Sequence, residues 1–151
     1  MKEIRHNRKR HRWVYVFCLL TMFSAAPAHA FLITLDGSAF SFQYAISGVG
    51  FFSGIKVVNL NEGTYSFVAA GNYTFRIDSN GLIQDIEAGT PLSGEGTTTL
   101  SIIPSRVKRV NFDGTPLSFQ YNISPVNTGR GGYLSGLGSF NLLPGLYRFI
   151  Q

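Results

Sequence analysis

Hydrophobic and polar residues alternate in two segments of this chain that have nearly the same sequence. DGSAFSFQYAIS spans residues 36–47 and DGTPLSFQYNIS spans residues 113–124, with eight identities in twelve positions. The large apolar side chains of each segment share one face: Phe40, Phe42, Tyr44 and Ile46 in the first, and Leu117, Phe119, Tyr121 and Ile123 in the second. A period of two predicts a half-buried β-strand in each segment, over residues 40–47 and 117–124.

Other runs of β-branched and aromatic residues predict further strands. These runs lie at residues 31–35, 57–60, 64–68, 72–77, 82–86, 97–103 and 107–112. Turn-forming pairs such as Asp36-Gly37 and Asp113-Gly114 separate them. No segment after residue 30 has the 3.6-residue period of an amphipathic helix, so the predicted fold class is all-β.

The similarity between the two segments continues downstream, which indicates an internal repeat. FFSGIKVVNLNEGTYSF at residues 51–67 aligns with YLSGLGSFNLLPGLYRF at residues 133–149, after five extra residues in the second segment. We define the first repeat as residues 31–69, the connecting strands as residues 70–109 and the second repeat as residues 110–151. The second repeat has no counterpart of the YTFRIDSNGLI hairpin that follows the first.

Each repeat, about forty residues long, is at the size below which a domain rarely folds without disulfides or a metal. We therefore expect both repeats to pack together with the connecting strands, as one antiparallel β-sandwich domain over residues 31–151. Two interpretations of the C-terminal end stay open. Either a last strand over residues 146–151 closes the fold, or the chain is a piece of a longer repetitive protein.

The first thirty residues have the pattern of a secretory signal peptide. A basic segment precedes the apolar run WVYVFCLLTMF at residues 13–23, and Pro27 then leads to Ala28-His29-Ala30, with small residues where signal peptidase requires them. We expect cleavage after Ala30 and a secreted or extracytoplasmic location, in the periplasm or at the cell surface if the source is bacterial. The alternative is an uncleaved anchor, but the apolar run is shorter than the ~20 residues that span a bilayer.

Removal of this segment changes the charge and the available chemistry. Six of the thirteen Lys and Arg and one of the eight acids lie in residues 1–30, so the mature chain carries seven of each and no net charge. All His, Cys, Trp and Met residues are also removed. This composition excludes a zinc finger, a thiol nucleophile, a disulfide and an imidazole-based triad, and it gives no reason to expect a cofactor or a nucleic-acid partner.

The order of motifs resembles prealbumin-like β-sandwich modules of exported proteins, such as collagen-adhesin B-type repeats and carboxypeptidase-regulatory-like domains. The residues that carry this resemblance are Asp36, Gly37, Phe40, Asn59, Leu60, Gly63, Tyr65 and Tyr73, with Asp113, Gly114, Asn141, Leu142, Gly145 and Tyr147 in the second repeat. The resemblance implies a structural, adhesive or ligand-presenting role. The stretches 66–69 and 148–151 lack the acid that assists an internal cross-link in adhesin repeats, so no isopeptide bond is predicted.

Few polar residues are candidates for a binding site. Gln43 and Gln120 recur beside Tyr44 and Tyr121, and we consider either a hydrogen bond between equivalent strands or glycan contacts by these four residues. Asn72 and Asn122 begin formal glycosylation sequons, which matter only in a eukaryotic source.

The clustered charges of the mature chain have simpler interpretations than active sites. The sequence DSNG at residues 78–81 favours a hairpin turn over a calcium loop, because its glycine comes at the fourth position rather than the sixth. Asp85 and Glu87 favour a solvated strand face over a catalytic pair. Arg106, Lys108 and Arg109 favour a linker or a charged edge strand over an anion site.

These observations lead to one expected function and one alternative. We expect an exported, non-enzymatic structural or adhesion-type protein with no metal or cofactor. Its partners are other copies of itself, other surface proteins or glycans, and it has no membrane contact after signal removal. The alternative is a carbohydrate-binding accessory module, which would need exposed coplanar aromatic side chains on one sheet face.

Overall fold

The computed structural model describes residues 29–151. The predicted signal peptide, with Ala28 at its cleavage site, lies outside the described residues except for His29 and Ala30, which are exposed. The described chain contains strands and one short 3₁₀ helix, η1 (Pro104–Arg106), which confirms the all-β prediction. Within residues 29–151 no helix is long and apolar enough to cross a membrane.

The strands follow one another with short connections. In chain order they are β1 (Phe31–Gly37), β2 (Tyr44–Ile46), β3 (Gly50–Phe52), β4 (Gly54–Leu60), β5 (Gly63–Val68), β6 (Asn72–Ile77), β7 (Ile83–Gln84), β8 (Leu92–Ser93), β9 (Thr99–Ile102), β10 (Lys108–Gly114), β11 (Tyr121–Pro125), β12 (Gly132–Leu134), β13 (Gly136–Leu142) and β14 (Tyr147–Ile150). Most predicted strands are present, although β7 and β9 are shorter than expected.

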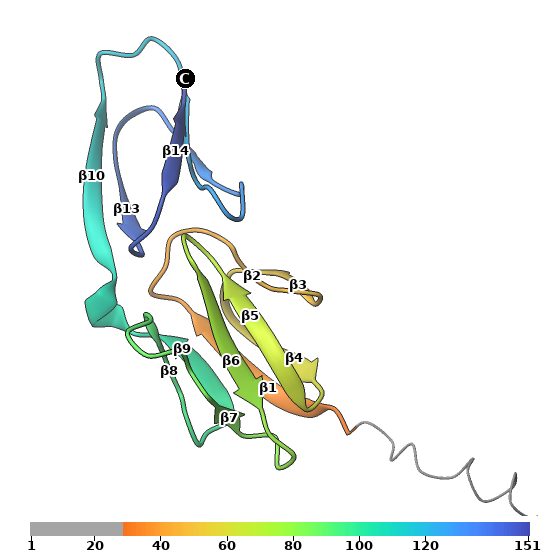
Figure 1. Ribbon diagram of the computed structural model, residues 1–151. Helices are drawn as coiled ribbons and strands as arrows, with labels where there is room; N and C mark the ends of the chain where they lie inside the picture. The colour runs from red at the N-terminus through yellow and green to blue at the C-terminus, as the bar shows by residue number, and fades with distance from the viewer. Residues whose placement is uncertain (1–28) are drawn as a thin grey trace, which may run out of the picture.

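The strands form four separate sheets, none of which is a barrel (Figure 1). Residues 31–102 build a sheet of order β4-β1-β9-β8 and another of order β3-β2-β5-β6-β7. Residues 108–150 build a pair β10-β13 and a three-stranded sheet β12-β11-β14. Strands β6 to β9 therefore extend the sheets of the first repeat alone, and among the described residues no sheet contains strands of both repeats.

Aligned residues of the two repeats occupy the same places in their strand pairs. In the first repeat β1 and β4 are antiparallel, with Phe31 opposite Leu60 and Gly37 opposite Gly54. In the second repeat β10 and β13 are antiparallel with the corresponding register, from Lys108 opposite Leu142 to Gly114 opposite Gly136. The order β3-β2-β5 of the first repeat likewise corresponds to β12-β11-β14.

Most of the core lies between the sheets of residues 31–102, and the buried Tyr121, Ile123 and Leu143 of the second repeat belong to the same cluster. Its fully buried side chains come from both sheets and include Ile33, Leu35, Tyr44, Ile46, Leu60, Phe67, Phe75, Ile77, Ile83 and Leu100. Alternation along β1, from Ile33 to Leu35, and along β6, from Phe75 to Ile77, places these side chains on one face of each strand.

The strand predicted for residues 40–47 is only partly correct. Phe40, Phe42, Tyr44 and Ile46 are all buried as the alternation indicates, but β2 contains only the last part of the segment. The carboxylate of Asp36 accepts a hydrogen bond from the Ser38 amide at 3.0 Å, which turns the chain after β1. Residues 38–43 then cross to the other sheet outside the ladders of the first repeat, because a connection between two sheets leaves both ladders.

The same segment connects the two repeats. The ring of Phe42 lies 4.7 Å from that of Phe140 and 6.0 Å from that of Tyr147, measured between centroids. Nearby, the backbone amide of Ser41 donates to the carbonyl of Asn141 at 3.1 Å, and the Asn141 amide donates to Ser41 Oγ at 2.7 Å. This loop of the first repeat therefore contacts strands β13 and β14 of the second (Figure 1). The repeats also meet where Arg130 lies over the Phe51 ring and where Asn127 Nδ2 donates to the Ala70 carbonyl.

In each repeat a glycine packs against the ring of a tyrosine seven residues further along the chain. A Cβ atom on Gly37 would collide with the Tyr44 ring, and one on Gly114 would collide with the Tyr121 ring. The Tyr44 hydroxyl donates to the Gly54 carbonyl at 2.9 Å, and the Tyr121 hydroxyl makes the corresponding bond to Gly136 at 3.2 Å. The glycine of each Asp-Gly pair is therefore needed for close packing, whereas the aspartate makes the turn.

Substitution of this glycine tests the packing. Gly37→Ala is expected to lower the free energy of unfolding by about 1–3 kcal/mol, because the new methyl group displaces the Tyr44 ring. Urea unfolding of residues 31–151 measures the change. The exposed Ser53 is a control, and Ser53→Ala is expected to change stability by less than about 0.5 kcal/mol. Equal stability of all three proteins would contradict the packing argument.

Ionisation of Tyr44 gives a second test. Burial, together with the nearby Asp36 carboxylate, raises the pKa of Tyr44 from 10.0 to about 12. Because the raised pKa favours the neutral phenol in the folded protein, its stabilising effect is complete below pH 10.0 and is lost as the pH rises through about 12. Tyrosinate ultraviolet absorbance, followed against pH in wild type and Tyr44→Phe, is expected to show one late-titrating group that the variant lacks.

Candidate functional site

The outer edge of β14 has no neighbouring strand within residues 29–151. In the first repeat the aligned strand β5 lies between β2 and β6, and Phe67 is opposite Tyr73 of β6. In the second repeat β14 pairs with β11 on one side, where Phe149 is opposite Ile123. One side of β14 therefore carries backbone N–H and C=O groups that the aligned strand uses for pairing.

The exposure of one aligned phenylalanine measures what this missing neighbour changes. Phe67 stacks on Tyr44 with centroids 4.9 Å apart, and Phe149 stacks on Tyr121 in the same way at 5.1 Å. Yet Phe67 is 2% exposed, whereas Phe149 is 49% exposed. The stacking contact with the tyrosine is therefore present in both repeats, but only Phe67 is shielded from solvent.

β10 also lacks a neighbouring strand on one side within residues 29–151. The aligned strand β1 pairs with β4 on one side and, in parallel, with β9 on the other, whereas β10 pairs with β13 alone in the described chain. Ile33 and Leu35 of β1 are fully buried, but the aligned Val110 and Phe112 are only half-buried. The two open strands, β10 and β14, belong to the two sheets of the second repeat.

This arrangement can bind another polypeptide strand. An uncovered edge offers a row of backbone donors and acceptors, and the half-buried Val110, Phe112 and Phe149 offer apolar surface beside it. Burial raises the pKa of Tyr147, at the start of β14, well above its usual range, and its hydroxyl donates to the Leu143 carbonyl at 2.9 Å. The Tyr147 side chain is therefore an uncharged hydrogen-bond donor at the start of β14.

The residues predicted for glycan contact are placed differently. Tyr44 and Tyr121 are 0% and 1% exposed, and their hydroxyls bond to backbone carbonyls, so neither ring is accessible to a sugar. Gln120 is exposed, whereas the Oε1 atom of Gln43 is buried with no hydrogen-bond partner. Within the described chain no hydrogen bond joins the two glutamines. Of the sequon residues, Asn72 is exposed and Asn122 half-buried.

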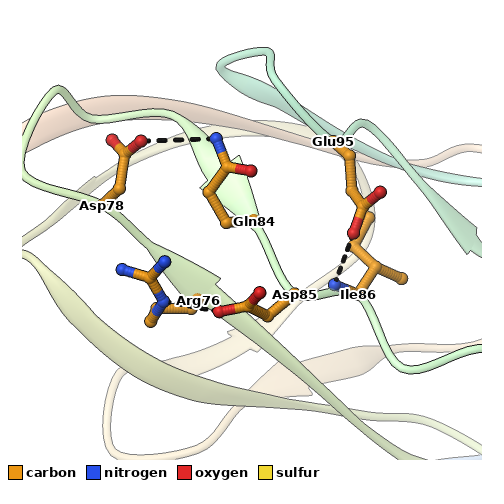
Figure 2. Close-up of polar contacts among 6 residues, drawn as sticks. All are labelled: Arg76, Asp78, Gln84, Asp85, Ile86 and Glu95. Atoms are coloured by element: carbon orange, nitrogen blue, oxygen red, sulfur yellow. Dashed lines mark hydrogen bonds and ion pairs between the residues drawn. The ribbon is translucent and has the colours of Figure 1, made fainter.

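The acidic residues near β6 and β7 support the hairpin and make no site. Figure 2 shows Arg76 paired with Asp85 at 2.6 Å and Asp78 bonded to Gln84 at 3.3 Å. Asp78 also accepts the amides of Asn80 and Leu82, which holds its pKa below the usual range and confirms the predicted turn.

The remaining acid of Figure 2 has the same kind of structural role. Glu95 accepts the Ile86 amide at 3.1 Å. Residues 29–151 contain no cluster of three or more His, Cys, Asp or Glu side chains that could hold a metal.

The basic residues mark the start of an open edge. Arg106 ends η1, and Lys108 and Arg109 begin β10, with the Arg109 guanidinium donating to Ser139 Oγ at 2.9 Å. The structure thus combines the predicted linker with the predicted charged edge strand. The open edges themselves were not among the predicted sites.

Comparison with known protein families, curated proteins and solved structures finds no match for this chain. The site is therefore interpreted from its own geometry.

A matched pair of substitutions tests whether β14 is uncovered in solution. Phe67→Ala is expected to cost about 3–5 kcal/mol of unfolding free energy, because it removes a fully enclosed ring. Phe149→Ala is expected to cost no more than about 1 kcal/mol in dilute protein, because half of its ring already faces solvent. Urea unfolding at low protein concentration measures both. Equal costs would mean that something covers Phe149 in the dilute chain.

Proposed function

We propose that this chain is an exported, non-enzymatic structural or adhesion-type protein that acts by strand addition at the second repeat. In this proposal the signal peptide is removed after Ala30, and each repeat is one β-sandwich module. The first module is completed by the connecting strands. The second module is completed by a strand from another polypeptide.

The exposure of Phe149 carries the proposal. The first repeat supplies the reference state, since its aligned Phe67 is buried in a sheet where β5 also pairs with β6. The second repeat has the same stacked aromatic pair and the same strand register, but lacks the covering strand in the described chain. Edges of this kind are normally shortened, charged or covered in monomeric proteins, because they promote association.

The carbohydrate-binding alternative has weaker support. Tyr133 on β12 is 73% exposed, and its aligned residue Phe51 on β3 is 49% exposed, so each repeat has one exposed aromatic side chain on that strand. The guanidinium of Arg130 lies 4.2 Å from the centre of the Phe51 ring and covers it. A coplanar aromatic platform is therefore not formed by these two residues.

Sedimentation velocity of the exported chain over a hundredfold range of concentration tests the proposal. We expect the sedimentation coefficient to rise with concentration. Phe149→Lys is expected to remove the part of this rise that comes from pairing at β14, because a lysine on that open edge must be desolvated when a strand pairs there. Tyr133→Lys adds the same charge at the opposite edge of the same sheet and is expected to leave the association unchanged.

A peptide provides a second measurement that does not depend on self-association. Residues 70–78, AGNYTFRID, contain β6 and supply the side chains that cover β5 in the first repeat. Fluorescence anisotropy of the labelled peptide should reveal binding to wild type and weaker binding to Phe149→Lys. A chain that stays monomeric at all concentrations and does not bind this peptide would contradict the proposed function.

A further inference from the structure

The backbone of β10 is oriented for pairing through three particular residues. In the first repeat the amide of Thr34 points away from β4 and donates to the Thr98 carbonyl at 2.9 Å. Thr34 aligns with Asn111, and the β10-β13 register reproduces the β1-β4 register. Because backbone groups alternate in direction along a strand, the free edge of β10 presents the N–H and C=O groups of Arg109, Asn111 and Asp113.

The side chains of β10 divide between two faces in the same alternation. Arg109, Asn111 and Asp113 are exposed, whereas Val110 and Phe112 are half-buried on the face toward the core. Opposite charges thus lie two residues on either side of Asn111. Such a strand is complementary to itself when it is reversed about Asn111.

We propose that the strand completing this edge is β10 of a partner subunit, paired antiparallel about a two-fold axis at Asn111. This inference rests on the proposed function and names its partner as a second copy of this chain. Asn111 then faces the partner's Asn111, and the backbone groups of both residues form a hydrogen-bonded pair. Arg109 lies opposite the partner's Asp113 on the outer face, and this contact occurs twice because the interface is isologous.

The inner face has matching chemistry in this register. Val110 lies opposite the partner's Phe112, so the half-buried apolar side chains of both subunits cover each other. The Asp113 carboxylate uses Oδ1 for its two bonds to Thr115, which leaves Oδ2 for the partner's Arg109. The zero net charge of residues 31–151 also removes long-range repulsion between subunits.

Charge substitutions on the two-fold axis test this register. Asn111→Asp and Asn111→Lys each place like charges directly opposite one another, and each is expected to weaken dimerisation at least about tenfold. An equimolar mixture of the two variants is expected to restore the dimer as a heterodimer with an Asp–Lys pair. Sedimentation velocity of each exported variant and of the mixture, at one concentration, measures these outcomes.

Further variants separate position from charge. Asn141→Asp and Asn141→Lys make the same changes on β13, opposite Arg109 and away from the free edge, and are expected to dimerise like wild type. Arg109→Asp is expected to weaken the dimer about tenfold, because it faces the partner's Asp113 twice. Far-ultraviolet circular dichroism checks that each variant folds.

The outcomes distinguish this inference from the function on which it rests. Wild-type dimerisation in Asn111→Asp and Asn111→Lys, or a mixture that stays monomeric, would overturn the two-fold pairing of β10. A wild-type chain that is monomeric yet binds the peptide of residues 70–78 would also overturn it, while leaving strand addition intact. Absence of both self-association and peptide binding would instead remove the proposed function.

Discussion

A strand inside a sheet needs a hydrogen-bonding neighbour on both sides, and the differences between the two halves of this protein follow from that requirement. In residues 31–102 the requirement is met for β1 by β4 and β9, and for β5 by β2 and β6. In residues 108–150 the aligned strands β10 and β14 each have one neighbour. Identical local pairing therefore produces an enclosed core in one half and an open side in the other.

The local packing of each repeat does not depend on this completion. Tyr121 is as deeply buried as Tyr44, and each hydroxyl reaches the carbonyl of the glycine that begins the next long strand. The Gly–Tyr contact and the β1-β4 and β10-β13 registers are set by residues within each repeat, so they form in both repeats. Burial by strands from outside the repeat is a separate contribution to packing. Phe67 has this burial and Phe149 does not.

The contact between the repeats also covers apolar side chains of the second repeat. Phe42 lies in the loop between β1 and β2 and packs against Phe140 and Tyr147, so the first repeat covers one end of the second. The aligned Phe119 has no such partner in the described chain and is 55% exposed. The same loop sequence is therefore buried in the first repeat, where it packs against the second repeat. In the second repeat it is exposed.

The sequence by itself determined the all-β class, most of the predicted strands and the turn at residues 78–82, because alternation and turn residues act over short distances. It also marked the basic start of β10. Only the tertiary structure decided that β6 to β9 extend the sheets of the first repeat, that residues 38–43 form a crossing loop, and that Tyr44 and Tyr121 are inaccessible. These outcomes depend on which distant strands share a sheet. Alternation in the sequence assigns a side chain to one face of a strand, but it does not determine what packs against that face.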